Sequence, residues 1–276
     1  MGETTEVLLM WAAVSVYAVA AVLFIVGFMF GKERLTALAL VATAIGIVPH
    51  VAAVAGRWVR LGHGPYLGFY EVISSFALLG SVGFLLLALR VRALRVAGTA
   101  LMPIAFIALG GAMLAPRGGL DVTPALASYW LGIHVAFAKL TYGSLITGFG
   151  LAIMFLLRAK RPDHRLLSRL PDDATLDDLV FKFVAAGFMF LGIMIAAGAV
   201  WANEAWGRYW GWDPIETWSL ISWLCYAAVL HARLTLGWNG PRFMWAAIVA
   251  LPVVLFALVG VAVVYNSIHG AYLTGP

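Results

Sequence analysis

Eight long apolar runs dominate this sequence and restrict the chain to a protein that crosses a lipid bilayer. A transmembrane helix needs about 20 consecutive, mostly apolar residues, and each run is long enough to span the membrane. We therefore predict an all-α fold: a polytopic membrane helix bundle of about eight transmembrane helices, forming a single transmembrane domain over residues 1–276. The runs lie at about 6–30, 36–58, 68–89, 95–115, 128–157, 179–202, 216–237 and 243–265.

The composition excludes several classes of protein. Hydrophobic residues make up 63% of the chain and charged residues only 11%, whereas a soluble domain is nearer half apolar and a quarter charged. A cytosolic enzyme and a disordered tail are therefore excluded. The net charge of +5 comes from basic residues in short connections, where they orient a membrane protein, so we expect no nucleic-acid partner. Cys225 is the single cysteine, and any thiol chemistry must involve thiols of a partner.

The basic residues are concentrated on one side of the predicted membrane. Twelve Lys and Arg residues lie on that side and four on the other. The positive-inside rule makes the first side cytoplasmic, which places both termini and the segment at about 201–218 outside. The twelve cytoplasmic cations are Lys32, Arg34, Arg90, Arg92, Arg95, Arg158, Lys160, Arg161, Arg165, Arg169, Arg233 and Arg242, and the four external ones are Arg57, Arg60, Arg117 and Arg208.

The external segment at about 201–218 contains five of the eleven tryptophans. An interfacial aromatic belt is the simplest explanation, but a belt needs only one or two such residues per helix end and no glycines between them. Indoles combined with close backbone approach at Gly207 and Gly211 favour a platform for a large flat apolar ligand. The five indoles belong to Trp201, Trp206, Trp210, Trp212 and Trp218.

Part of the same segment has the pattern of a helix start. Asp213 is placed to act as the N-cap, Pro214 as the first helical residue, and Glu216 lies in the first turn. These residues are expected to have a structural role whatever else the segment does. We assign neither Asp213 nor Glu216 as an acid or a base; each could face solvent, a cation such as Arg208, or a partner protein.

Two histidines are predicted at the depth of the tryptophan segment. His134 lies about one turn inside the outer end of the fifth run, and His269 follows the outer end of the eighth. Two neutral imidazoles that face one another across a flat ring can ligate heme iron from both sides. His231 falls in the inner half of the bilayer and His50 also lies within it, where an ionisable group is functional by default. Taken singly, each histidine is more often a hydrogen-bonded packing residue than a ligand.

Two motifs resemble those of a known family. The stretch WGRYWGWDPIE at 206–216 is similar to the WWD signature of the heme-handling proteins of cytochrome c biogenesis. Its continuation to His231, together with GHGPYLGFYE at 62–71, resembles the CcsA (ResC) subunit family of the System II cytochrome c synthetase. The resemblance extends from about residue 50 to the end of the chain.

The resemblance implies roles for individual residues. His134 and His269 match a pair that ligates heme b at the outer face, and His231 matches a histidine that holds heme within the bilayer. Ile215 departs from the family, which often has Lys at this position. Whether His50 or His63 supplies a further ligand is left open, since a partner polypeptide could do so. The matching WWD residues, which would lie against the porphyrin, are Trp206, Trp210, Trp212 and Asp213.

The resulting hypothesis is a heme-handling subunit of a holocytochrome c synthase (heme lyase). It would transport heme or present it at the outer face, where the thiols of an apocytochrome c CxxCH segment attach to it. The expected partners are a CcsB (ResB)-like membrane subunit and apocytochrome c, with thiol reductant proteins as further candidates. The expected location is a bacterial inner membrane, or alternatively a thylakoid membrane.

Two rival functions follow from the same features. A b-type heme electron-transfer protein that interacts with quinone would also need paired histidines, but would place both within the bilayer and has no use for an exposed tryptophan platform. A secondary transporter predicts internal repeats, and the sequence shows none.

Overall fold

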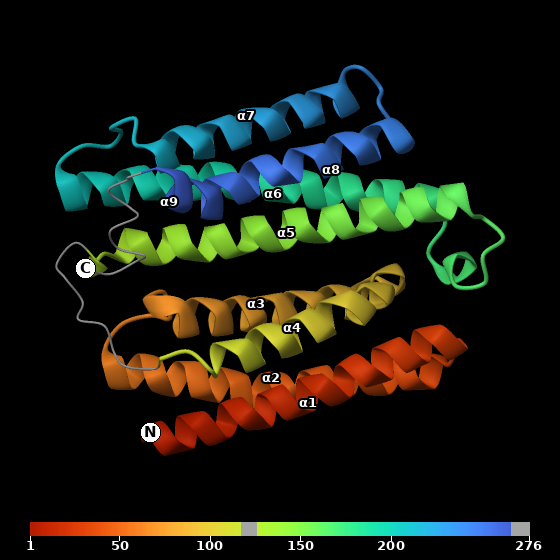
Figure 1. The fold of residues 1–276 in the computed structure, drawn as a ribbon, viewed down its shortest axis with the longest axis horizontal. Coiled ribbons are helices and arrows are strands. Elements are labelled where there is room, and N and C mark those ends of the chain that lie inside the picture. The colour runs from red at the N-terminus through yellow and green to blue at the C-terminus, as the bar shows by residue number, and fades with distance from the viewer. Residues whose placement is uncertain (117–125, 266–276) are drawn as a thin grey trace. The chain divides into compact units, whose positions relative to one another are not determined.

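The computed structural model describes residues 1–116 and 126–265, and all regular structure in these residues is helical. The chain divides into two compact units, Met1–Val122 and Thr123–Pro276, which are described separately (Figure 1). The prediction of an all-α membrane bundle is confirmed. His269, one of the predicted heme ligands, lies outside the described residues.

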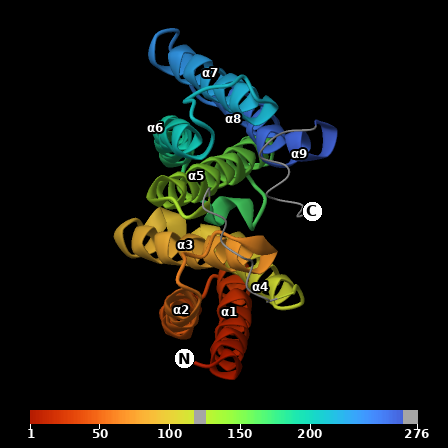
Figure 2. The same cartoon turned by 90° about the vertical axis from the view of Figure 1, so that its left-hand side faces the viewer.

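The first unit is built from four helices. Helix α1 packs against α2 and α4, and α3 packs against α2 and α4 (Figures 1 and 2). Its core combines small side chains with large buried ones such as Tyr17, Phe24 and Met102. The elements are α1 (Glu3–Phe30), α2 (Glu33–Leu61), α3 (Gly68–Arg90), a 3₁₀ turn η1 (Arg92–Ala97) and α4 (Gly98–Ala112).

The second unit carries the tryptophan segment. Helix α5 packs along α6, α8 packs against α5 and α7, and α7 also packs against α6. Asp172 caps the start of α6, because its carboxylate accepts a hydrogen bond from the backbone N–H of Thr175 at 2.8 Å, which lowers the pKa of Asp172. The elements are α5 (Tyr129–Lys160), a 3₁₀ turn η3 (Leu167–Arg169), α6 (Asp173–Trp206), α7 (Pro214–Leu234), α8 (Pro241–Leu255), a π-helical turn η4 (Phe256–Gly260) and α9 (Val261–Val264).

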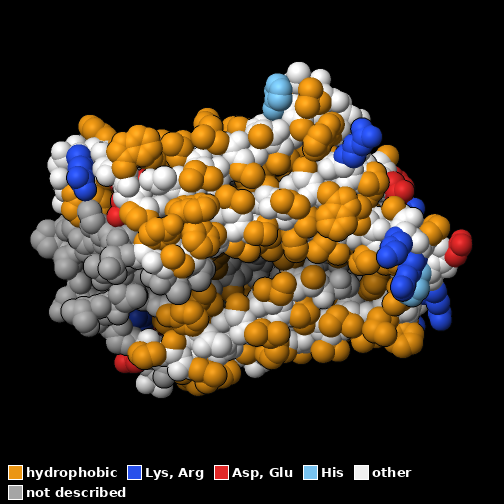
Figure 3. Space-filling view, turned by 45° about the horizontal axis from the view of Figure 1, so that its top comes forward, with side chains coloured by type: hydrophobic (Ala, Val, Ile, Leu, Met, Phe, Trp, Pro, Cys, Tyr) orange, Lys and Arg blue, Asp and Glu red, His pale blue; other side chains and the backbone are white. Residues whose placement is uncertain are grey.

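Seven helices of the described residues are long and apolar enough to cross a membrane. Helix α7, the seventh predicted run, is outside this set, and the remaining runs each correspond to one of the seven. On the face drawn in Figure 3, hydrophobic side chains cover the middle of the helices and charged side chains lie towards the helix ends. This distribution is the one expected for helices surrounded by lipid.

Candidate functional site

A pocket lies at one end of the second unit, where α5, α6 and α7 meet the segment between α6 and α7. His134 of α5 and Trp201 of α6 line it, together with Tyr209 and Trp210 of the segment and Glu216 of α7. The space between these side chains is about 390 Å³, and this figure includes space that is open to solvent. The structure thus brings together one predicted histidine and two of the predicted tryptophans.

The imidazole of His134 is oriented by the backbone of α6. Its Nδ1 lies 2.8 Å from the carbonyl oxygen of Met194. A carbonyl can only accept, so Nδ1 donates, and in the neutral ring the lone pair is then on Nε2. Metal-ligating histidines commonly use this arrangement, in which the second ring nitrogen is held by a backbone carbonyl. His134 is therefore in the tautomer that could ligate a metal through Nε2.

A glycine on α6 leaves the space in which the His134 ring reaches the Met194 carbonyl. Gly198 follows Met194 by one helical turn, and a β-carbon at Gly198 would come within 2.7 Å of Nδ1 of His134. Any larger residue at this position would push the ring away from the Met194 carbonyl. Sequence reasoning missed both Met194 and Gly198, since a glycine within an apolar helix carries no signal of its partner across the interface.

The five tryptophans occupy different environments. Trp201 is buried and its ring lies 6.4 Å from that of His134, with Trp206 edge-on to Trp201 at 4.9 Å. Trp210 lines the pocket, and the ring of Trp212 is perpendicular to it at 5.8 Å, exposed at the surface. Trp218 packs edge-on against Phe256 at 4.6 Å. Four of the predicted platform residues are therefore linked to the pocket, whereas Trp218 contacts the π-helical turn.

The predicted helix start at Asp213 is confirmed. The Asp213 side chain accepts a hydrogen bond from Ile215 N at 3.0 Å, Pro214 occupies the first turn, and Glu216 completes a capping box. Gly207 ends α6 in the left-handed conformation, with φ of 72°, and no atom lies within 4 Å of where its β-carbon would be. Gly207 is thus needed for the helix end, and the close approach to a flat ligand at Gly207 and Gly211 stays a prediction.

Two of the other predicted ligands do not line this pocket, one in the second unit and one in the first. His231 is in the last turn of α7, about 25 Å along the helix from Pro214, where it is exposed and its Nδ1 lies 3.3 Å from the Thr235 hydroxyl. His50 belongs to the first unit and is fully buried, with Nδ1 3.2 Å from the Tyr17 hydroxyl and Nε2 without a hydrogen-bond partner.

A buried ion network joins the ends of three helices in the first unit. Glu6 of α1 accepts hydrogen bonds from Arg57 at 3.2 Å and Tyr70 at 3.0 Å, and it also pairs with Arg60. Arg57 Nε donates to Glu71 of α3 at 2.9 Å. Arg57 and Arg60, predicted as cations of an external connection, are therefore part of α2. This network was not predicted from the sequence. The signal that could have indicated it is a set of oppositely charged residues at equal depth on neighbouring apolar runs.

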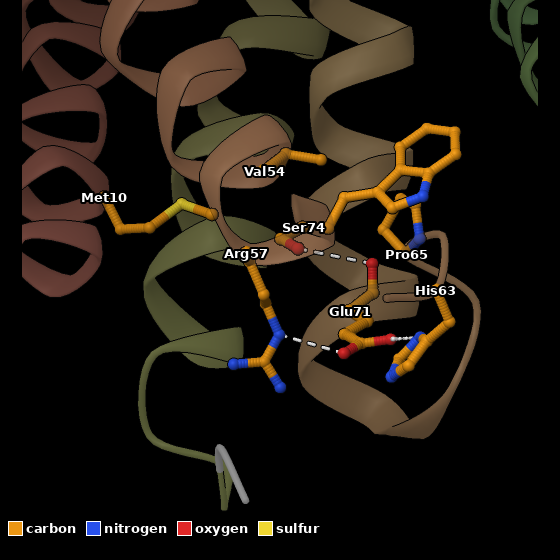
Figure 4. Close-up of a pocket in the computed structure, with 8 residues that line it drawn as sticks. Met10, Val54, Arg57, His63, Pro65, Glu71 and Ser74 are labelled. Carbon is orange, nitrogen blue, oxygen red and sulfur yellow. Dashed lines mark hydrogen bonds and ion pairs between the residues drawn. The ribbon is translucent and has the colours of Figure 1, made fainter. Parts of the chain in front are cut away.

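The connection between α2 and α3 is fastened to the same network. Glu71 also accepts from Leu67 N at 3.0 Å, and His63 points towards it, with Nδ1 3.8 Å from the Glu71 carboxylate (Figure 4). His63 Nδ1 donates to the Gly64 carbonyl at 2.9 Å. The GHGPYLGFYE motif is thus explained in this structure by the folding of a tight connection.

Comparison with known proteins shows the family of this chain. Residues 65–269 match the model of a family described as "Cytochrome C assembly protein". The chain belongs to this family. The match includes α5, α6, the tryptophan segment and α7, so it contains all of the pocket described above.

Among similar sequences are proteins named cytochrome c biogenesis protein CcsA. The CcsA of Gloeobacter violaceus is 32% identical, with 98% of this chain and 97% of that protein covered. The CcsA of Chlamydomonas reinhardtii is 37% identical over 77% of this chain and 62% of its own length, so the chain spans less than two thirds of that relative. The predicted resemblance to CcsA is confirmed.

A solved structure shares the fold. The structure titled "Cytochrome c Heme Lyase CcmF" aligns with 99% of this chain and 48% of its own, with a TM-score of 0.64 and 19% sequence identity. At this identity the likeness concerns the fold alone. The helical arrangement is therefore similar to one already known from a protein titled a cytochrome c heme lyase.

Proposed function

We propose that this protein acts in cytochrome c biogenesis by binding heme b in the pocket of the second unit and presenting it for attachment to apocytochrome c. The observation that carries the proposal is the environment of His134. Its Nδ1 is tied to the Met194 carbonyl at 2.8 Å, and the residue lines the same pocket as Trp201 and Trp210. A metal-ligating nitrogen beside aromatic walls fits an iron porphyrin.

His269 is proposed as the second axial ligand, from its place after the eighth apolar run and its match to the family motif. His231, exposed in the last turn of α7, is proposed to hold heme at a different depth in the membrane. The relatives' names support the general role and not the individual ligands, since they are named cytochrome c biogenesis proteins and one structural neighbour is titled a heme lyase.

The attachment reaction requires positioning more than acid–base chemistry. Each thiol of a CxxCH segment adds across one vinyl group, forming a carbon–sulfur bond while the thiol hydrogen is transferred to the neighbouring vinyl carbon. Binding and alignment of both reactants supply much of the rate acceleration in such reactions. In this chain, His134 would hold the iron, and Trp201 and Trp210 would flank the ring. Asp213 and Glu216 hold the segment in shape through the capping box.

The location of the protein in the cell and its partners are part of the same proposal. The pocket would open to the outer side of a bacterial inner membrane or to a thylakoid lumen, with both termini on that side and residues 1–276 acting as a single transmembrane domain. A CcsB-like subunit is proposed as the membrane partner. The rival function, electron transfer between heme and quinone, is less favoured because His134 lies in the second turn of α5, close to the end of the helix.

Absorption spectra of the purified full-length protein test the axial pair. We expect the wild type to carry heme and both His134→Ala and His269→Ala to lose it, with partial restoration by added imidazole, which can replace the missing ring. His164→Ala provides a matched control, because His164 is exposed in the connection between α5 and α6. Unchanged spectra in both variants would exclude the proposed ligands.

A further inference from the structure

The carboxylate of Glu216 binds the backbone on both sides of Trp212. One oxygen, Oε2, lies 2.8 Å from Gly211 N and 3.2 Å from Asp213 N, and both N–H groups donate to it. A capping box requires only the second of these hydrogen bonds. The bond to Gly211 therefore ties a further residue of the segment to the first turn of α7.

Trp212 lies between these two N–H groups in an unusual conformation. Its φ is +58°, and it is the one non-glycine residue with positive φ among residues 1–116 and 126–265. A side chain with a β-carbon rarely adopts this conformation, and it persists only when surrounding contacts enforce it. Convergent N–H groups around a left-handed residue form a concavity that accepts an anion. Here the anion is the Glu216 carboxylate.

We propose that Glu216 is a positioning residue that sets the relative orientation of Trp210 and Trp212. By holding Trp212 in the left-handed conformation, it turns the Trp212 ring perpendicular to that of Trp210, which lines the pocket. Trp212 is 69% exposed, so burial of this residue does not enforce the conformation. The inference rests on the proposed heme site and specifies how its aromatic wall is held.

Replacement of Glu216 by glutamine and by leucine distinguishes a positioning role from a role of its charge or of proton transfer. Glutamine keeps an oxygen that can accept both N–H groups and is itself found at this position of capping boxes, but it has no charge and cannot exchange a proton. Leucine keeps a similar volume and has no acceptor. If Glu216 positions the segment, Glu216→Gln should resemble the wild type and Glu216→Leu should not.

The experiment combines hydrogen exchange with heme content in the full-length protein. In Glu216→Leu we expect the backbone amides of 208–213 and 215 to exchange at least about tenfold faster, since hydrogen bonds to a charged acceptor are lost. Bound heme should fall, while any heme that stays bound keeps the wild-type spectrum because His134 is unchanged. Glu216→Gln should keep most of both properties. Asp172→Ala removes the equivalent cap of α6 at the other end of the unit and should alter neither.

Each outcome decides between the alternatives. If Glu216→Gln lost as much heme and cytochrome maturation as Glu216→Leu while exchange stayed slow, the charge would be the essential property and the proposal would be wrong. Unchanged exchange in Glu216→Leu would also overturn it. A wild type without heme would refute the proposed function alone, because the exchange measurement would still decide the role of Glu216.

Discussion

At the scale of single residues, the pocket depends on groups that act through their neighbours. His134 could be recognised from the sequence, but its tautomer follows from a hydrogen bond to the carbonyl of Met194, sixty residues later. Gly198 is the residue that leaves space for the ring. The tautomer of this proposed ligand is thus set by an adjacent helix, in accordance with the general importance of groups that orient metal ligands.

Replacement of Gly198 by alanine should weaken heme binding. The new β-carbon would lie 2.7 Å from Nδ1 of His134, so the ring must move and its bond to Met194 is lost. Loss of such a supporting contact typically costs 10- to 100-fold in metal affinity, and we expect about this decrease in heme titrations. Gly143→Ala on α5, where nothing lies within 4 Å of the added carbon, is the control. Equal affinity of the two variants would contradict the prediction.

At the scale of elements, two polar arrangements hold helix ends together. In the second unit, Asp213 and Glu216 shape the segment between α6 and α7. In the first unit, Arg57 links Glu6 of α1 to Glu71 of α3. All three of these charged side chains of the first unit are buried. A buried charge is tolerated only when it is paired, so each partner depends on the others.

Removal of Arg57 should destabilise the first unit strongly. Arg57→Ala leaves the carboxylates of Glu6 and Glu71 buried without their shared partner, and the loss of one member of such a network costs about 3–5 kcal/mol. Lys182→Ala breaks an exposed pair with Asp178 and should cost only about 0.3–0.5 kcal/mol. Denaturant titration of the protein in detergent would measure both. A similar effect of the two changes would show that the network contributes little.

The tryptophans of the segment should differ in function from those of an interfacial belt. Trp210→Ala combined with Trp212→Ala should lower heme content while the protein still inserts in the membrane, because the indoles line and flank the pocket. The control pair is Trp11→Ala with Trp245→Ala, two exposed tryptophans on α1 and α8. If both pairs had the same effect on heme content, the segment would be an aromatic belt.

At the scale of the whole molecule, the helices are long and apolar enough to make the chain a multi-pass membrane protein. Charge asymmetry between the connections predicts which side faces the cytoplasm. Eight of the twelve cations on the predicted cytoplasmic side flank or lie in two connections, at 90–95 and 158–169. Arg57, one of the four cations of the other side, is paired with Glu6 and Glu71.

Cysteine labelling should establish this orientation. In a Cys225→Ser background, Thr4→Cys at the N-terminus and Arg208→Cys between α6 and α7 should react with a membrane-impermeant maleimide added to intact spheroplasts. Ser168→Cys, in the connection between α5 and α6, should react only after permeabilisation, because the positively charged side is retained in the cytoplasm. The reverse pattern would invert the proposed topology and place the pocket inside.

The sequence alone was sufficient for the helices, the helix start at Asp213 and the family. Apolar length is a local property, and so is the order of Asp213, Pro214 and Glu216 along the chain. The joint environment of His134, Trp201 and Trp210 was anticipated from their similar depth. It could not be predicted that Trp218 packs on Phe256 or that Trp212 has a left-handed backbone, because these depend on helix rotation and on contacts across the bundle.

The sequence by itself therefore determined a membrane-spanning helical protein with an aromatic segment and a histidine at matching depth, since lipid imposes length and polarity on each segment independently. Only the tertiary structure decided which nitrogen of His134 donates to the backbone, why Gly198 faces it, and how Glu216 holds Trp212. The physical reason is that hydrogen bonds and close packing join atoms that are neighbours in space, and residues far apart in the chain become such neighbours only when the helices pack.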